Sequence, residues 1–193
     1  NLANQGAIAT PNGGHVYLLA PNVENSGVIV SPGGKIVLAA GKTVELVDPQ
    51  TPNLRVELTA PNNQAVNVGQ LLADRGHVGI YAGLIRNGGT IRANTAVIGE
   101  NGTIALKALR DITLETASVI TANGASGGAI AIEAGAQLSA PSTVANTQSS
   151  VAPVATTPPS ATTSSPPTLL VSGIVQAKGA SGTGGAIQLL GDH

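Results

Sequence analysis

The sequence predicts an all-β fold in which short strands stack into a parallel β-helix with about 20 residues per coil. Three observations carry this prediction. A Gly-rich unit recurs along the chain, apolar residues alternate with period 2 inside each unit, and the apolar residues are almost entirely Ala, Val, Ile and Leu. Tyr17 and Tyr81 are the only residues among Phe, Trp and Tyr, so the interior must be narrow enough to fill without large rings.

The repeating unit follows a Gly-x-Ile-x-Ala pattern, a Gly-rich corner and an apolar-x-apolar-x-Ala ending. Clear units begin at Gly6, Gly27, Gly69, Gly89, Ser118 and Gly173. The first four starts differ by 21, 42 and 20 positions, which gives a period of about 20. The 42-residue interval predicts one more, weakly marked coil in TVELVDPQTPNLRVELTAP, where Val44, Leu46, Val56 and Leu58 alternate.

Period-2 alternation favours short, half-buried strands, and no segment keeps a helical stripe, so we expect almost no helix. A single unit cannot bury its own inward side chains. If successive coils lie about 4.8 Å apart, these side chains form continuous apolar ladders along the axis. The expected inward residues are Val16, Leu18, Ile36, Leu38, Val78, Ile80, Ile104, Leu106, Ile130, Ile132, Ile187 and Leu189.

Glycine and alanine occupy the expected corners of each coil. A sharp corner needs a positive φ, which glycine adopts without a Cβ clash, and a crowded inner corner needs a small side chain. The Gly-rich corners are Gly13–Gly14, Gly33–Gly34, Gly127–Gly128 and Gly184–Gly185, and the alanines that end the units are Ala20, Ala40, Ala82, Ala108 and Ala134.

One segment interrupts the repeat. Residues 139–167 contain 6 Pro, 7 Ser and 6 Thr and no charged residue, a composition that cannot bury enough apolar surface to fold alone. We therefore divide the chain into β-helix coils at 1–138, a Pro/Ser/Thr-rich loop at 139–168, and a continuation of the β-helix at 169–193. An interdomain linker is the alternative interpretation of the middle part.

Composition argues against several partners. Charged residues are 10% of the chain and the net charge is -1, so the protein has no strong field to attract nucleic acid or anionic lipid. No apolar run reaches the roughly 18 residues of a membrane-spanning helix, and the first residues lack a signal-peptide pattern. We expect no membrane insertion, and we expect the chain to be an excerpt or a processed product.

Parallel β-helices can also carry polysaccharide-degrading sites, which need clustered carboxylates with a nearby cation. The acidic candidates are Asp48, Asp74, Asp111, Glu115 and Glu133. They are scattered singly among the coils, so we expect solvated side chains, no catalytic residues and no enzyme activity.

His15 and His77 occupy equivalent places in two units and could share a metal ion only if they lay close together. We count three coil steps between them, roughly 14 Å, and expect surface histidines and no metal. The Gly-rich runs GASGGA and GASGTGGA do not continue as a phosphate-binding motif, and no cofactor is expected. Asn101-Gly102-Thr103 fits a glycosylation sequon, a pattern that is often accidental.

The stretch APNVENSGVI at Ala20–Ile29, and the LAAG-x-x-V-x-L stretch at Leu38–Leu46, resemble the filamentous-haemagglutinin-like exoproteins of Gram-negative two-partner secretion systems (TpsA-type adhesins). The likeness covers residues 6–135 well and 172–191 more loosely. It resembles the latter part of their secretion region, without the Asn-Pro-Asn-Gly-type motif found earlier in that region. Recognition by the transporter is therefore not assigned to these residues.

The resemblance implies a right-handed parallel β-helix, export through an outer-membrane transporter, and a secreted, cell-surface location. It also implies a structural or adhesive stalk that serves cell adhesion, biofilm formation or effector display, with a host or matrix glycan or protein as the unidentified partner. A self-stacking subunit of an extracellular filament is the alternative, because unpaired strand edges promote end-to-end association. A β-helical polysaccharide-degrading enzyme is the third hypothesis.

Overall fold

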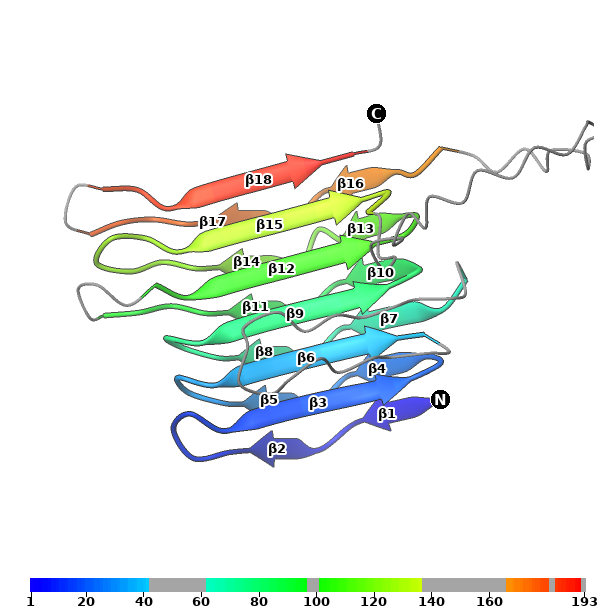
Figure 1. The fold of residues 1–193 in the computed structure, drawn as a ribbon, viewed down its shortest axis with the longest axis horizontal. Coiled ribbons are helices and arrows are strands. Elements are labelled where there is room, and N and C mark those ends of the chain that lie inside the picture. The colour runs from blue at the N-terminus through cyan, green and yellow to red at the C-terminus, as the bar shows by residue number, and fades with distance from the viewer. Residues whose placement is uncertain (42–61, 97–100, 137–165, 181–182, 192–193) are drawn as a thin grey trace, which may run out of the picture.

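In the computed structural model, the described residues form three parallel β-sheets, each with six strands (Figure 1). It describes residues 1–41, 62–96, 101–136, 166–180 and 183–191. No helix occurs in these ranges, so the described residues contain no helix that could cross a membrane. The all-β class and the parallel stacking of coils are confirmed. The right hand of the helix stays a prediction.

Each sheet takes every third strand of the chain. Sheet A contains β1 (Leu2–Asn4), β4 (Val23–Asn25), β7 (Gln64–Asn67), β10 (Leu84–Asn87), β13 (Ile112–Leu114) and β16 (Leu169–Val171). Sheet B contains β2 (Ala7–Ala9), β5 (Val28–Val30), β8 (Gln70–Leu72), β11 (Thr90–Arg92), β14 (Val119–Thr121) and β17 (Ile174–Gln176). Sheet C contains β3 (His15–Ala20), β6 (Lys35–Ala40), β9 (His77–Ala82), β12 (Thr103–Ala108), β15 (Ala129–Ala134) and β18 (Ala186–Leu190).

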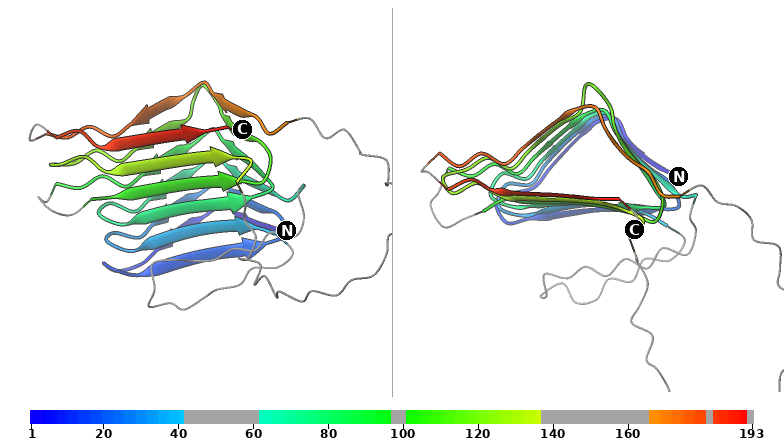
Figure 2. Two further views of the ribbon diagram at one scale, coloured as in Figure 1. Left: turned by 45° about the horizontal axis from the view of Figure 1, so that its top comes forward. Right: turned by 90° about the horizontal axis from the view of Figure 1, so that it is seen from above.

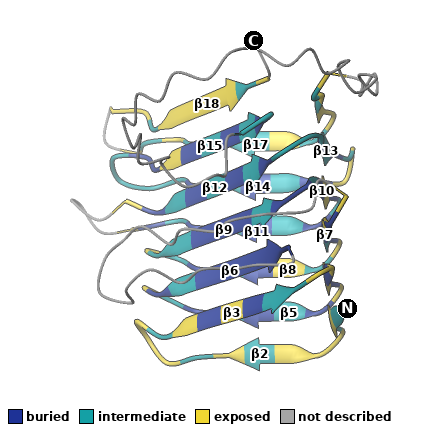
Figure 3. Ribbon diagram, turned by 45° about the vertical axis from the view of Figure 1, so that its right-hand side comes forward, coloured by how far each residue is buried: buried dark blue, intermediate teal, exposed yellow. Residues whose placement is uncertain are grey.

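One coil contributes one strand to each sheet, and the coils superpose into a three-sided outline when seen along the stack (Figure 2). The inward side chains of the three sheets meet in a single aliphatic core. Ile36 and Val78 are 0% exposed and Ile104 is 1% exposed, as the period-2 pattern predicts. The inward side chains are fully buried in the middle coils and become more exposed toward both ends of the stack (Figure 3).

Two predicted core residues do not lie in the core. Ile187 and Leu189 are each 45% exposed. They pair in register with the buried Ile130 and Ile132, so their side chains have the inward orientation. β18 is the last strand of sheet C among the described residues, and it has a neighbour on one side only. Alternation therefore predicted the direction of these side chains correctly but could not predict their exposure.

The expected extra coil between Gly27 and Gly69 is wrong. Strand β5 pairs directly with β8, with Val28 opposite Gln70, and β6 pairs directly with β9, with Lys35 opposite His77. No coil lies between these strands. The proposed strand residues from Val44 to Leu58 fall outside the described residues. Alternating apolar residues indicate that one face of a segment is buried, but they do not show that the segment belongs to the coil stack.

The uniform period of about 20 residues also fails in sheet C from the third coil onward, where His77 pairs with Thr103, 26 positions later. His15 pairs with Lys35, 20 positions later, but Thr103 pairs with Ala129, 26 positions later. Strand register sets which residues stack, whereas connecting loops tolerate extra residues at small cost in free energy. Residues 137–165, which include most of the Pro/Ser/Thr-rich segment, lie outside the described residues. The coils before and after it stack directly, with Ala129 of β15 opposite Ala186 of β18.

The corner glycines serve two separate needs, as the second corner shows. Gly33 has φ of 61°, the left-handed conformation expected there. Gly34 has no such φ, but a Cβ added to it would lie 1.7 Å from the carbonyl oxygen of Gly14 in the preceding coil. Glycine is therefore required at this second position because the backbones of successive coils approach closely.

Candidate functional site

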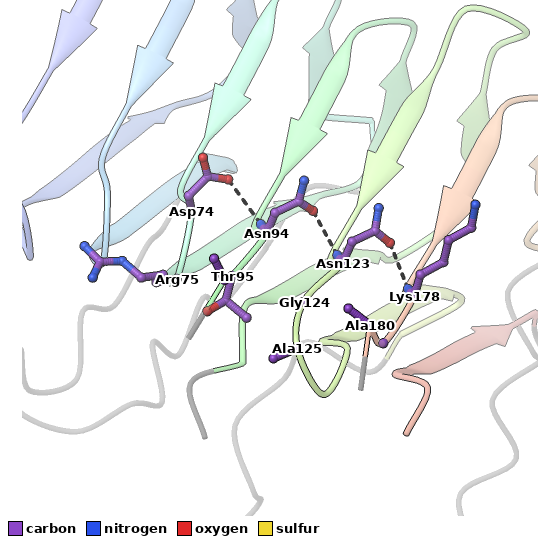
Figure 4. Close-up of a pocket in the computed structure, with 11 residues that line it drawn as sticks. Asp74, Arg75, Asn94, Thr95, Asn123, Gly124, Ala125, Lys178 and Ala180 are labelled. Atoms are coloured by element: carbon purple, nitrogen blue, oxygen red, sulfur yellow. Dashed lines mark hydrogen bonds between the residues drawn. The ribbon is translucent and has the colours of Figure 1, made fainter. Parts of the chain in front are cut away.

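A row of polar side chains follows sheet B along one corner of the stack (Figure 4). Asp74, Asn94, Asn123 and Lys178 each lie two residues after the end of a sheet B strand. Asp74 Oδ1 accepts a 3.2 Å hydrogen bond from the backbone N–H of Asn94. Asn94 Oδ1 and Asn123 Oδ1 each accept a 2.8 Å bond from the backbone N–H of the next residue in the row. We call these four residues the corner row.

The corner row borders an open groove with a volume of about 910 Å³. This size falls within the roughly 300–1,000 Å³ of ordinary ligand sites. Small residues that follow each row position complete the lining, among them Ala96, Ala125 and Ala180. The two Gly-rich runs named above begin at Gly124 and Gly179, which also line this groove. No helix follows either run in the described residues, whereas a phosphate-binding loop opens a helix.

Arg75 lies at the start of the groove in a strained conformation. Its φ is 64°, and it is the only non-glycine with positive φ among the described residues. Its place corresponds to Gly13 and Gly33 in the two preceding coils, because each of the three donates its backbone N–H to a carbonyl of the following coil. The guanidinium donates a 2.6 Å hydrogen bond to Asn12 Oδ1. A non-glycine held in this region costs free energy and points to a functional constraint.

A second polar ladder lies inside the stack, at the end of sheet A. Asn4 Nδ2 donates to Asn25 Oδ1 at 2.7 Å, Asn25 Nδ2 to Asn67 Oδ1 at 2.8 Å, and Asn67 Nδ2 to Asn87 Oδ1 at 2.6 Å. Asn87 Nδ2 then donates to Ser118 Oγ at 2.6 Å. Asn25 and Asn87 are 0% exposed. We call these five residues the amide ladder.

Sequence reasoning missed the amide ladder, although the chain carries a signal for it. Each of the four asparagines is followed two residues later by the glycine that begins a unit: Gly6, Gly27, Gly69 and Gly89. The Nδ2 of Asn25 also reaches the carbonyl of Gly27 at 3.3 Å, and the Nδ2 of Asn87 reaches that of Gly89 at 3.2 Å. Side chains of this type often bond to the backbone two residues on. The Asn-x-Gly repeat therefore marks the corner at which the ladder forms.

The described acidic candidates do not converge on one site. Asp74 forms a two-point ion pair with Arg92, whose Nε and NH2 lie 3.0 and 2.8 Å from its carboxylate oxygens. Glu115 pairs with Arg86, and Glu133 pairs with Lys107 at 2.9 Å. Asp111 Oδ1 accepts the backbone N–H of Thr168 at 2.8 Å. Asp48 falls outside the described residues.

The two candidate histidines lie on the outer face of sheet C. Strands β3 and β9 are separated by β6 alone, so His15 and His77 are two coil steps apart and not three, as the sequence suggested. Two steps are roughly 10 Å, still too far for a shared ion. The ring of His77 lies 2.7 Å from Thr103 Oγ1, and burial together with the charge of Lys35 lowers its pKa. Among the described residues, no three His, Cys, Asp or Glu side chains group as metal ligands.

Comparison with known proteins gives a structural relative. No family model and no curated protein matches the chain. The solved structure of the HMW1 secretion domain from Haemophilus influenzae matches with a TM-score of 0.59 at 29% sequence identity. The match covers 67% of this chain and 42% of that chain, so this chain spans less than half of the HMW1 domain structure. The likeness is to a secretion domain, in agreement with the two-partner secretion resemblance.

Proposed function

We propose that the chain is a rigid segment of a secreted, filamentous-haemagglutinin-like exoprotein and that its role is structural and adhesive. Two independent likenesses support this. The motifs at Ala20–Ile29 and Leu38–Leu46 resemble that family. The three-sheet stack resembles the HMW1 secretion domain in its fold.

The observation that carries the proposal is the continuity of the stack. In the described part of the chain, all three sheets run without a break through six coils, and each strand pairs with strands of the adjacent coils. The amide ladder adds a line of buried hydrogen bonds parallel to this axis. Such a stack resists bending because any bend separates ladder partners in a water-poor interior, where an unpaired amide is costly. A stiff rod suits a stalk that presents binding surfaces away from a cell.

Export through an outer-membrane transporter is the part of this proposal that is simplest to test. The full-length protein would be followed by immunoblotting of culture supernatant and cell surface, in cells that carry or lack the transporter gene next to its own gene. Loss of extracellular protein on deletion, with restoration by the cloned gene, supports the proposal. Deletion of an unrelated outer-membrane transporter is the control. Unchanged export without any neighbouring transporter would overturn the assignment to this secretion class.

We also propose that the segment has no enzyme activity. Three of the described acidic candidates, Asp74, Glu115 and Glu133, are each paired with a cation from a neighbouring coil. Acid–base cleavage of a glycosidic bond uses two carboxyl groups at one site, whereas these three carboxylates lie in separate ion pairs. Incubation of the purified chain with polygalacturonate, alginate and chondroitin sulfate should release no new reducing ends or unsaturated products. Turnover that is lost on substitution of any of these three residues would refute this part.

Adhesion is tested by binding of the purified chain to epithelial cells and to immobilised matrix proteins. Saturable binding supports an adhesive role, and its absence leaves the segment a spacer. Filament formation stays a prediction, which light scattering over a range of protein concentrations decides.

A further inference from the structure

We propose that the groove along the corner row binds an extended acidic oligosaccharide, with its chain parallel to the axis of the stack. This inference rests on the proposed adhesive function and names the class of ligand. The inference starts from side-chain hydrogen-bond donors of the corner row that have no acceptor among the described residues. The Oδ1 atoms of Asn94 and Asn123 are occupied by backbone N–H groups of the next coil. Their Nδ2 groups donate no hydrogen bond to the described residues.

These open donors lie in one line. Figure 4 shows the side-chain nitrogens of Asn94, Asn123 and Lys178 on the same side of the row. Each belongs to a successive coil, so neighbouring donors are separated by about 4.8 Å. Lys178 is exposed and makes no ion pair with a described residue. The site therefore offers a periodic row of donors that ends in a cation.

The charges around the groove favour an anionic ligand. Arg75 and Lys178 line its two ends, and the single lining carboxylate, that of Asp74, is neutralised by Arg92. From Asp74 to Lys178 the row spans three coil steps, roughly 14 Å. The strained backbone of Arg75, where two other coils have glycine, is a separate sign that this end of the groove is constrained by more than folding.

The geometry favours a glycan over other polymers. An extended peptide presents carbonyls to one side only about every 6.8 Å, a spacing that does not match donors about 4.8 Å apart. A nucleic acid would need aromatic platforms for its bases, and no aromatic residue lines the groove. Because no aromatic residue lines the groove, it also has no flat apolar surface on which neutral sugars could stack. Carboxylate or sulfate groups along a sugar chain supply the acceptors that Nδ2, Nζ and guanidinium groups require.

Isothermal titration calorimetry on the purified chain tests the proposal, with a galacturonic acid hexamer, a chondroitin sulfate hexasaccharide and neutral cellohexaose as probes. We expect at least one acidic probe to bind, cellohexaose not to bind, and the affinity to fall as salt rises. The two acidic arms distinguish a uronate ligand from a sulfated one. A hexaglutamate peptide that binds as tightly as the sugars would overturn the glycan assignment.

The decisive variant is Asn123→Asp. It keeps the Oδ1 acceptor for the backbone of Lys178 but replaces the Nδ2 donor with a negatively charged oxygen, so we expect affinity to fall by about tenfold or more. Asn22→Asp is the matched control, because its Oδ1 also accepts a backbone N–H, that of Gln64, at a corner away from the groove. This control should change affinity by less than about twofold.

If Asn123→Asp lowers the melting temperature of the protein, Lys178→Gln replaces it in the test. The Lys178 side chain is exposed, and its amine makes no ion pair with a described residue. Unchanged affinity in the variant that remains folded, or no binding of any acidic probe, would overturn the proposal. Transporter-dependent export and cell binding would then still stand, so failure of the groove proposal is distinguishable from failure of the proposed function.

Discussion

The side-chain amide of Asn25 donates a 2.8 Å hydrogen bond to Oδ1 of Asn67, although 42 positions separate the two residues in the chain. Both residues are buried, at 0% and 1% exposure. The bond joins two adjacent coils, whose strands β4 and β7 pair directly. It also links a local feature, the asparagine two residues before a unit glycine, to the long-range order of the stack.

Loss of one ladder member should destabilise the whole protein. Asn67→Ala leaves the Oδ1 of Asn87 without its donor, and it removes the shortest bond of Asn25 Nδ2, which keeps only the 3.3 Å bond to the carbonyl of Gly27 and a 3.5 Å bond to that of Gln70. An orphaned buried group costs about 1–3 kcal/mol, and a lost hydrogen bond costs about 1 kcal/mol more. We expect the free energy of unfolding to fall by about 2–5 kcal/mol in urea denaturation. Asn22→Ala, at an exposed corner, should cost less than about 1 kcal/mol. Equal effects of the two substitutions would show that the amide ladder is not a stabilising feature.

The core should respond to position along the stack. Ile130 and Ile187 are register partners with the same orientation, yet they are 1% and 45% exposed. Ile130→Ala creates a cavity and should cost about 2–5 kcal/mol, whereas Ile187→Ala should cost about 1 kcal/mol or less. Thermal and urea unfolding measure both. A larger loss at Ile187 would mean that β18 contributes more to stability than its exposure indicates.

These two pairs show what the sequence could and could not predict. Alternation identified the inward residues from Val16 to Leu189, because the side-chain period of a strand is the same in every environment. It could not predict exposure at the end of the stack, because exposure depends on the next coil. It also could not tell that β5 pairs with β8 across the 42-residue interval, since pairing partners are set by the register of the sheet and not by the pattern within one segment.

The candidate site was harder to predict than the fold. The described acidic candidates Asp74, Glu115 and Glu133 lie in separate ion pairs, and the absence of catalytic carboxylates stays a prediction. The corner row was missed because its four positions hold three residue types (Asp74, Asn94, Asn123 and Lys178), although each directly follows the alanine that ends the Gly-x-Ile-x-Ala part of a unit. Their alignment along one groove follows from the register of sheet B.

Arg75→Gly should leave stability unchanged or raise it by up to about 1 kcal/mol. The substitution removes the cost of a non-glycine at φ of 64°, and it loses one exposed hydrogen bond to Asn12. Differential scanning calorimetry of the variant measures this, and Arg86→Gly, within strand β10, should be destabilising. A loss of more than about 1 kcal/mol in Arg75→Gly would mean that the guanidinium contact outweighs the backbone strain.

His77 should make the protein less stable in mild acid. Burial first, and then the charge of Lys35, lowers its pKa below the usual 6.5. The unfolded chain therefore takes up a proton at this residue at a higher pH than the folded protein does. As pH falls from about 6.5 toward the lowered pKa, the free energy of unfolding decreases. Urea denaturation at pH 7.5 and 5.5 should show a smaller difference for His77→Gln than for the unchanged protein, and His15→Gln, at an exposed position, should not reduce the difference.

The order of the coils depends on the direct pairing of β5 with β8. An engineered disulfide tests this pairing, because the chain contains no cysteine of its own. Val28→Cys with Gln70→Cys places two thiols on adjacent coils, where a Cα separation of about 4.8 Å lies within the roughly 4.4–6.8 Å that a disulfide accepts. Val28→Cys with Thr90→Cys places them two coils apart. Mild oxidation followed by mass spectrometry should detect an intramolecular bond in the first pair and none in the second. A bond in the second pair alone, or in neither, would contradict the register on which the stack, the amide ladder and the groove all depend.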